Sequence, residues 1–360
     1  MSETIEQTIT NEFLKEIRSV DETRGFMVGR EDYLVGRGVL FGTKYAPWIA
    51  EAMGLKDEEK IRGLGRACMY GRSLTIAMDQ EFDSDTESSK VPKIVWTGTL
   101  IYLFSKTVTS AKDFFPNDDL NKQKRNKASI YVLEAKDLAE KINIFEMIRH
   151  THAPSEKIRP YIATEIDRIG KKTAMISVPP RLVGLLLEHP LEGEKLTEVM
   201  YNAIIAIQLC DDIADMEEDF ERGFYTAPLA HSFRLREEKE RKYRAALKGL
   251  FVPGTFEVFL NRSVHYLNRA GLGLINLSGP KDNHISTYFG NLAKRLQQLS
   301  KQVAEVRADY KLPKIRYDDS LSSLVPQKLD EKTEDEIVER LSDFVSQVEP
   351  KKISPLALGM

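Results

Sequence analysis

Residues 200–219 read MYNAIIAIQLCDDIADMEED, an apolar run that leads directly into a cluster of acidic side chains. The apolar part, Met200–Ile207, predicts a buried helix, and the acids continue that helix. At 100° per residue, Asp211, Asp215 and Asp219 fan over roughly 80° of one helix face. Three carboxylates one turn apart repel one another, so we expect a divalent cation such as Mg²⁺ to offset their charge.

The apolar residues before the acids indicate that this cluster ends in the protein interior. A solvated acidic face is the alternative interpretation. We expect the side chains of Asp212 and Glu218 to point elsewhere than those of the other three acids and to be solvated.

A second acidic cluster, Asp79–Asp85, ends another largely apolar stretch, Ala67–Met78. Asp79 and Asp83 are four residues apart and therefore share one helix face. Two such carboxylate sets can hold two or three Mg²⁺ ions around a diphosphate, drawing off charge while the carbon–oxygen bond breaks to an allylic cation. Basic residues must then bind the diphosphate oxygens.

Helical periodicity dominates the rest of the chain, and breakers such as Pro and Gly fall between long segments. Ser129–Met147, Glu198–Glu221 and His284–Tyr310 are each expected to form one long helix. The sequence predicts an all-α protein, a single bundle of about ten helices around a central cavity, judged from typical helix length. We place this domain at residues 1–328 and a C-terminal amphipathic helix with a tail at residues 329–360.

Net charge, cysteine count and the length of apolar stretches exclude several classes of protein. The 360 residues carry a net charge of −3, which gives no sign of nucleic-acid binding. Two cysteines exclude a disulfide framework and fit a reducing compartment. The polar N-terminus and the lack of a long apolar stretch predict a cytoplasmic protein with no transmembrane segment.

The main acidic cluster resembles the second aspartate-rich motif, Gln-x-x-Asp-Asp-x-x-Asp-x-x-x-Asp, of the class I isoprenoid synthase superfamily. This superfamily comprises trans-prenyltransferases and terpene cyclases. Asp79–Asp83 is similar to its first motif, Asp-Asp-x-x-Asp, with Gln80 in place of the second aspartate. The resemblance implies an isoprenoid synthase fold and three Mg²⁺ ions with bound diphosphate, with Mn²⁺ able to substitute. The implied metal ligands are Asp79, Asp83, Asp211, Asp215 and Asp219, of which Asp79, Asp83, Asp211 and Asp215 are the implied catalytic set.

Basic and pocket residues follow from the same resemblance. Lys172-Thr173 resembles the Lys-Thr pair of the superfamily, whose lysine contacts diphosphate. Arg316-Tyr317 resembles an Arg-Tyr pair that many cyclases close over the diphosphate. The implied diphosphate ligands are Lys172, Arg222, Arg316 and Tyr317, and the implied pocket residues are Leu74, Thr75, Trp96, Thr173 and Gln208.

The sequence lacks several basic residues that prenyltransferases of the superfamily use to bind their second substrate, isopentenyl diphosphate. The segment Gly42–Pro47 is nearest to the Gly-Lys-Arg-x-Arg-Pro signature that binds isopentenyl diphosphate, and Thr43 and Ala46 replace two of its basic residues. The arginines expected after the first motif are replaced by Ser88-Ser89-Lys90. Because arginine binds phosphate bidentately, these losses weaken a second diphosphate site.

The sequence therefore favours a terpene synthase that ionises and cyclises one prenyl diphosphate, with farnesyl or geranylgeranyl diphosphate as the expected substrate. The alternative is a trans-prenyl diphosphate synthase, in which Lys44, Lys90 and Lys93 replace the missing contacts. A third interpretation is a non-catalytic partner subunit that keeps the fold. Homodimers are common among such proteins.

Overall fold

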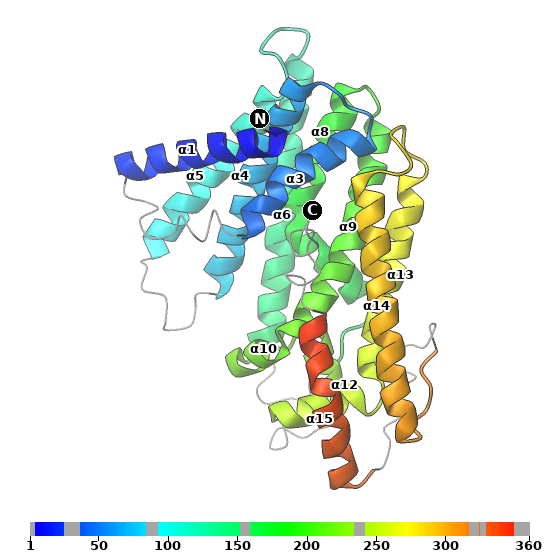
Figure 1. Cartoon of the computed structure of the whole chain (residues 1–360). Coiled ribbons are helices and arrows are strands. Elements are labelled where there is room, and N and C mark those ends of the chain that lie inside the picture. Colours follow the sequence, from blue (N-terminus) through cyan, green and yellow to red (C-terminus); the bar gives the residue numbers. More distant parts are fainter. Residues whose placement is uncertain are drawn as a thin grey trace. The chain divides into compact units, whose positions relative to one another are not determined.

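The computed structural model of the chain describes residues 4–24, 37–83, 93–151, 159–233, 242–316, 324 and 329–348. Every regular element in these ranges is helical, so the prediction of an all-α protein is confirmed (Figure 1). The elements outnumber the ten or so expected, because short helices separate the long ones. They are α1 (Ile5–Arg24), α3 (Arg37–Ala52), α4 (Glu58–Asp83), α5 (Lys93–Asp113), α6 (Lys122–Thr151), α7 (Ala163–Ile169), the 3₁₀ helix η1 (Gly170–Ser177), α8 (Val178–Leu186), α9 (Pro190–Ala214), α10 (Met216–Arg222), α11 (Ala227–Ser232), α12 (Tyr243–Phe251), α13 (Thr255–Leu274), α14 (His284–Asp309) and α15 (Glu331–Gln347).

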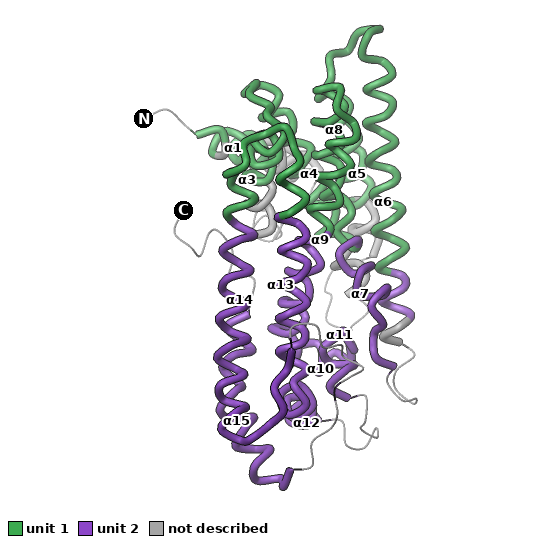
Figure 2. The backbone as a smooth tube through the Cα atoms, turned by 90° about the vertical axis from the view of Figure 1, so that its right-hand side faces the viewer, with its two compact units in different colours: residues 1–143, 172–201, 272–287 green, residues 144–171, 202–271, 288–360 purple. Residues whose placement is uncertain are grey.

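The chain divides into two compact units, coloured separately in Figure 2. Unit 1 comprises residues 1–143, 172–201 and 272–287, and unit 2 comprises residues 144–171, 202–271 and 288–360. Four long helices, α6, α9, α13 and α14, carry residues of both units. The predicted boundary after residue 328 falls within unit 2, and α15 belongs to that unit.

Helix α4 is the centre of unit 1 and packs against α1, α3, α5 and α8. Its side chains Leu64 and Met69 are fully buried. Gly65 allows α1 to approach closely, since a Cβ at Gly65 would lie 2.5 Å from Ile9 Cδ1. The apolar stretch before the first acidic motif is therefore core, as the sequence predicts.

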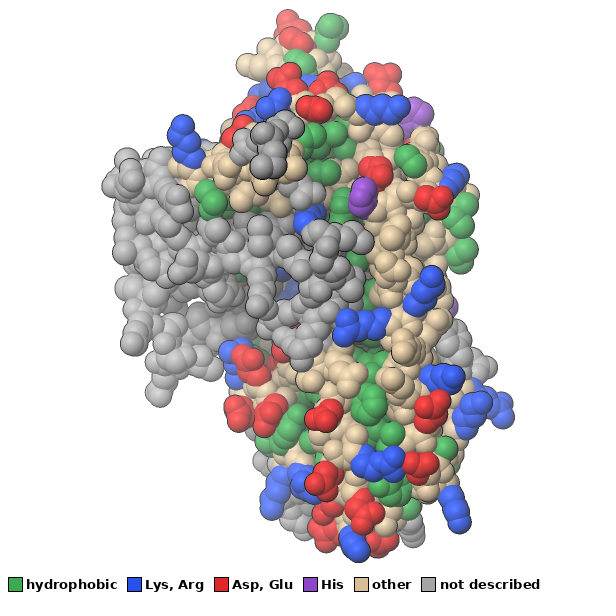
Figure 3. All heavy atoms as spheres, viewed as in Figure 1, with side chains coloured by type: hydrophobic (Ala, Val, Ile, Leu, Met, Phe, Trp, Pro, Cys, Tyr) green, Lys and Arg blue, Asp and Glu red, His purple; other side chains and the backbone are tan. Residues whose placement is uncertain are grey.

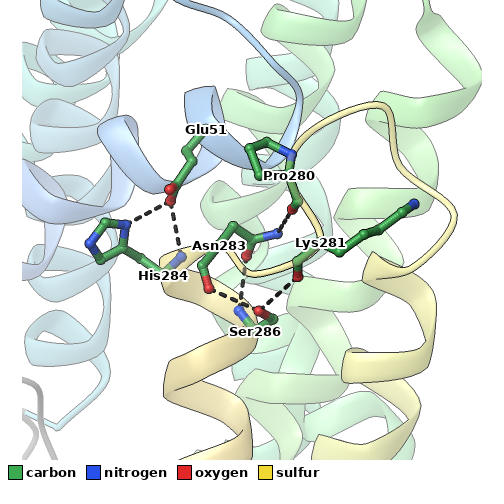
Figure 4. A network of polar contacts seen from close by, with 6 residues as sticks. All are labelled: Glu51, Pro280, Lys281, Asn283, His284 and Ser286. Atoms are coloured by element: carbon green, nitrogen blue, oxygen red, sulfur yellow. Dashed lines mark hydrogen bonds and ion pairs between the residues drawn. The ribbon is translucent and has the colours of Figure 1, made fainter.

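A polar network fixes the start of α14 on the end of α3, also within unit 1 (Figure 4). The Glu51 carboxylate accepts the backbone N–H of His284 at 3.0 Å and lies 2.7 Å from the Nδ1 atom of the same residue. Asn283 caps the helix by accepting the N–H of Ser286 at 2.9 Å. Gly279 is required in the loop before it, because a Cβ there would lie 2.2 Å from the Ala52 carbonyl oxygen.

A buried ion pair organises one end of unit 2. Arg307 of α14 and Glu257 of α13 are each at most 2% exposed, and Arg307 Nη1 lies 2.8 and 3.0 Å from the two Glu257 oxygens. The other terminal nitrogen of Arg307 donates to the Val252 carbonyl at 3.1 Å. Gly254, with φ 88°, completes the turn between α12 and α13, and a Cβ there would lie 2.5 Å from Ile315. We call Val252, Gly254, Glu257, Arg307 and Ile315 the arginine clamp.

Helix α15 lies where the sequence predicts a C-terminal amphipathic helix, and its apolar side is packed. Its apolar side chains Ile337, Val338 and Leu341 are buried, and it packs against α12. Lys248 of α12 pairs with Asp335 at 2.9 Å, one of several ion pairs on this surface. Figure 3 shows acidic and basic side chains interspersed in this part of the molecule. The predicted tail after α15 lies outside the described residues.

Across the described residues, none of the helices combines the length and apolar character needed to cross a bilayer.

Candidate functional site

The main acidic cluster lies where α9 passes into α10, within unit 2. The expectation of one helix over Glu198–Glu221 is wrong at one residue, because Asp215 (φ −94°, ψ 9°) separates the two helices. Helical hydrogen bonds nevertheless continue across the break: Asp215 N donates to the Asp211 carbonyl at 2.8 Å, and Asp219 N to the Asp215 carbonyl at 2.9 Å. Asp211, Asp215 and Asp219 therefore stay one turn apart, as predicted.

Gly223 ends α10 directly after the cluster. Its φ of 73° lies in the left-handed region, which glycine adopts without a steric cost. Phe224 N donates to the Asp219 carbonyl at 2.8 Å and Gly223 N donates to the Phe220 carbonyl at 3.1 Å, the bonding pattern of a Schellman motif. The chain turns here and starts α11 at Ala227, with Pro228 in its first turn.

Asp212 overturns one sequence expectation. Its side chain is buried, with 7% exposed, rather than solvated. Burial raises the pKa of Asp212 well above its ordinary value, and the charge of Asp219 raises it further. Gln208 opposes this shift, because its Nε2 donates to Asp212 Oδ1 at 2.8 Å. Gln208 thus binds the buried carboxyl of Asp212. The sequence predicted only that Gln208 lines the substrate pocket. Glu218 is exposed, as expected.

Glu146 of α6 is a member of this acidic region that sequence reasoning missed. Its charge, like that of Asp211, raises the pKa of Asp212. Glu146 is an isolated acid 65 residues before Asp211, and no pattern in the sequence connects the two. Only the tertiary fold could reveal it.

The first acidic motif ends α4. Asp79 and Asp83 lie on this helix one turn apart, and Asp83 is its last residue, but their side chains are outside the described part of the structure. Leu74 and Thr75, predicted to line the pocket, are buried, and Thr75 Oγ1 donates to the Gly71 carbonyl at 3.1 Å. The predicted pocket residue Trp96 lies on α5, and its side chain is likewise not described.

Lys172 and Thr173 lie in η1, where the backbone kinks at Thr173 (φ −94°, ψ 38°). Residues 172–177 of η1 belong to unit 1. They lie beside α4, since a Cβ at Gly71 would be 3.7 Å from Met175 Cβ. Gly71 precedes Asp79 by two helix turns, about 12 Å along the axis. The Tyr45 hydroxyl of α3 also donates to the Ile176 carbonyl at 2.8 Å. The lysine predicted to bind diphosphate is therefore carried by a kinked segment beside the helix of the first motif.

Of the remaining predicted diphosphate ligands, Arg222 and Arg316 lie in the described part of the chain. Arg222, the last residue of α10, pairs with Glu218 at 2.5 Å and is half-exposed. Arg316 is exposed and directly follows Ile315, which packs against the turn at Gly254. Tyr317 lies outside the described residues.

The structure places the predicted ligands in both units. Asp79, Asp83 and Lys172 belong to unit 1, whereas Asp211 through Asp219 belong to unit 2. Among the residues whose side chains are described, no three His, Cys, Asp or Glu side chains are grouped closely enough to hold a metal ion.

Comparisons of the chain with protein-family models, with curated proteins and with solved structures give no match. Function is therefore inferred from the residues and the geometry described above.

Proposed function

We propose that the chain is a magnesium-dependent class I terpene synthase with an isoprenoid synthase fold. It ionises a linear prenyl diphosphate, with farnesyl or geranylgeranyl diphosphate as substrate, cyclises or rearranges the carbocation and releases diphosphate. One observation carries this proposal: Asp211, Asp215 and Asp219 occupy successive helical turns in front of a buried fourth acid, Asp212.

The donor chemistry of these side chains, rather than their spacing in this structure, supports a hard divalent cation. Carboxylate oxygens are the ligands that Mg²⁺ prefers, together with water and substrate phosphates. Burial is the largest cause of the raised pKa of Asp212, and the charge of neighbouring acids raises it further, a charge that a cation would offset. Asp211, Asp215 and Asp219, with Asp79 and Asp83, would hold the ions. Bound Mg²⁺ supplies electrostatic stabilisation of the departing diphosphate.

The basic residues have separate tasks in this proposal. Lys172 would donate to the diphosphate oxygens from the kinked η1 segment, and Arg316 with Tyr317 would bind the same group from the segment after α14. Arg222 would exchange its Glu218 partner for diphosphate. Gln208 would act through Asp212, to which its Nε2 donates at 2.8 Å, as a positioning residue. Apolar walls, to which Leu74 contributes, would keep water from the carbocation.

A trans-prenyl diphosphate synthase is the second candidate, and one observation favours it. Lys44 lies on α3 next to Tyr45, whose hydroxyl donates to the Ile176 carbonyl of η1 at 2.8 Å. The segments that carry Lys44 and Lys172 are therefore adjacent in unit 1. Two lysines so placed could bind the diphosphate of a second substrate.

The decisive experiment incubates the purified chain and Mg²⁺ with geranyl, farnesyl or geranylgeranyl diphosphate, with and without isopentenyl diphosphate. Products are identified by gas chromatography–mass spectrometry after extraction, with phosphatase treatment to reveal longer prenyl alcohols. Asp211→Ala is the test variant. Glu217→Ala is the matched control, because Glu217 is an exposed acid on the adjoining helix.

A cyclic or rearranged terpene from one substrate, lost in Asp211→Ala and retained in Glu217→Ala, supports the synthase. Longer prenyl chains that form only with isopentenyl diphosphate support the second candidate. No turnover of any substrate, with diphosphate and Mg²⁺ failing to bind together, rejects both and favours a non-catalytic subunit.

A further inference from the structure

The 3₁₀ helix η1, which carries Lys172, is bound at its C-terminal end by a buried tyrosine of α3. The Tyr45 hydroxyl donates to the Ile176 carbonyl at 2.8 Å, across 131 positions of the sequence. Tyr45 is only 3% exposed, and burial raises the pKa of its hydroxyl well above the ordinary value, so the hydroxyl keeps its proton and remains a donor. A buried carbonyl that loses its donor costs free energy, so this bond fixes where the end of η1 lies.

Two further contacts within unit 1 hold the same end of η1. Thr197 Oγ1 of α9 donates to the Gly193 carbonyl at 2.9 Å and also reaches the Ser177 carbonyl at 3.4 Å. On the α4 side, Met175 is buried, and a Cβ at Gly71 would lie 3.7 Å from its Cβ, an ordinary packing distance. The end of η1 is therefore contacted by α3, α4 and α9.

Lys172 lies just before this anchored end, on the other side of the kink at Thr173. A 3₁₀ helix rises about 2 Å per residue, so Lys172 is about 8 Å along the axis from Ile176. Pro179 and Pro180 follow directly in the first turn of α8, where each fixes its own φ. The chain after η1 is therefore stiff as well, and the position of Lys172 depends on how η1 is anchored.

We infer that Tyr45 is a positioning residue for Lys172: its hydrogen bond to the Ile176 carbonyl sets where the lysine ammonium meets the diphosphate. The inference rests on the proposed function, in which Lys172 binds diphosphate. A shift of about 1 Å in a group that contacts substrate can cost about 100-fold in rate, so one anchoring bond can matter to the reaction. The segment Gly42–Pro47, nearest in sequence to the isopentenyl diphosphate signature, would in this way serve the first substrate.

Calorimetric titration of the full-length chain with inorganic pyrophosphate in the presence of Mg²⁺ tests the inference. Tyr45→Phe keeps the ring and removes only the hydroxyl. We expect it to weaken pyrophosphate binding about tenfold, and Lys172→Ala to weaken binding at least as much. The double variant Y45F/K172A should bind no more weakly than Lys172→Ala alone, because Tyr45 acts through Lys172.

Tyr70→Phe is the matched control. Tyr70 is likewise a buried tyrosine of unit 1, but it lies on α4 and its ring packs on Phe13 of α1 at a centroid distance of 5.3 Å. This variant should bind pyrophosphate as the wild type does. Thr197→Val removes the second hydroxyl at the end of η1 and should weaken binding in the same direction, so it replaces Tyr45→Phe if that variant does not fold.

Kinetics with the prenyl diphosphate substrate separate positioning from stability. A displaced Lys172 raises KM, whereas a smaller folded fraction lowers only the apparent kcat. Wild-type affinity in Tyr45→Phe, or an equal further loss when Tyr45→Phe is added to Lys172→Ala, overturns the inference and leaves the proposed function standing. A wild type that binds no pyrophosphate overturns the proposed function and this inference with it.

Discussion

Unit 2 buries acidic side chains in two different ways. In the arginine clamp, Glu257 faces the guanidinium of Arg307, whose two terminal nitrogens have partners within the chain. In the acidic cluster, Asp212 faces the neutral amide of Gln208, and its charged neighbours are acids. Burial raises the pKa of both carboxyls, that of Glu257 to about 7.

The difference lies in what compensates the charge. Arg307 lowers the pKa of Glu257 against the effect of burial, so the chain itself supplies the counter-charge. At Asp212, the charges of Asp219, Glu146 and Asp211 add to the effect of burial. Glu257 therefore has a cationic side chain as its direct partner, whereas the charged groups that shift the pKa of Asp212 are themselves acids.

Asp211→Asn should produce the largest effect, and on activity alone. Removing one ligand charge from the transition-state site should lower kcat/KM about 10³-fold, about 4 kcal/mol. Repulsion within the cluster falls at the same time, so the free energy of unfolding without Mg²⁺ should stay the same or rise. Product formation and thermal unfolding measure the two quantities. A loss of activity that is matched by unfolding would remove the distinction between the two regions.

Arg307→Leu should act on stability instead. It leaves Glu257 buried without its counter-charge, which costs about 3–5 kcal/mol in typical buried pairs. Urea unfolding measures this cost. The comparison variant is Arg340→Leu, because Arg340 pairs with Asp309 on the surface at 2.8 Å, and exposed pairs contribute about 0–1 kcal/mol. Equal costs for the two variants would contradict the role of the clamp.

Stability should also depend on pH in a defined direction. Glu257 has a pKa of about 7 when folded, against about 4.3 in an unfolded chain, so the folded state binds the proton more tightly. The free energy of unfolding should therefore fall as pH rises from about 4 to about 7. Asp212 acts in the same direction because its pKa is also raised.

Asp212→Asn should make that decline shallower and stabilise the metal-free chain at pH 8 by about 1–2 kcal/mol. Denaturant titrations at a series of pH values measure the slope. Added Mg²⁺ should stabilise the wild type more than this variant. Identical slopes in the two proteins would show that Asp212 does not carry an uncompensated charge.

The last pair of variants changes one glycine in each region. Gly223→Ala places a side chain in the left-handed region but meets no atom within 4 Å, so we expect a cost of about 1 kcal/mol. Gly254→Ala adds a clash with Ile315 to the same backbone strain, and should cost about 2 kcal/mol or more. Thermal melts of the two variants would rank them. The opposite ranking would mean that Ile315 moves aside freely.

Much of the fold could be predicted from local patterns. Periodicity and breakers predicted α14 close to its observed bounds, the middle of the longer helix α6, and a helix where α15 lies, because each is decided by residues within one or two turns. The break at Asp215 was missed, since the helical hydrogen bonds continue across it and no glycine or proline marks it.

The candidate site was predicted less completely. Spacing alone placed Asp211, Asp215 and Asp219 on successive turns. Spacing does not say which side of a helix is covered by neighbours, so the burial of Asp212 was missed. Glu146 and the pair Glu257–Arg307 were missed for a related reason: their contacts join residues 50 or more positions apart, and each is an unremarkable polar residue within its own helix.

The packing of Ile315 against Gly254 limits the positions that the next residue, Arg316, can adopt. Consecutive Cα atoms are about 3.8 Å apart, so the Cα of Arg316 lies within that distance of the Cα of Ile315, whose side chain is packed against Gly254. The Arg316 guanidinium can therefore occupy only positions within the length of one side chain from that Cα. The backbone entropy of Arg316 is already lost when the chain folds. An anion that binds its guanidinium therefore orders less of the chain, and binding costs less conformational entropy.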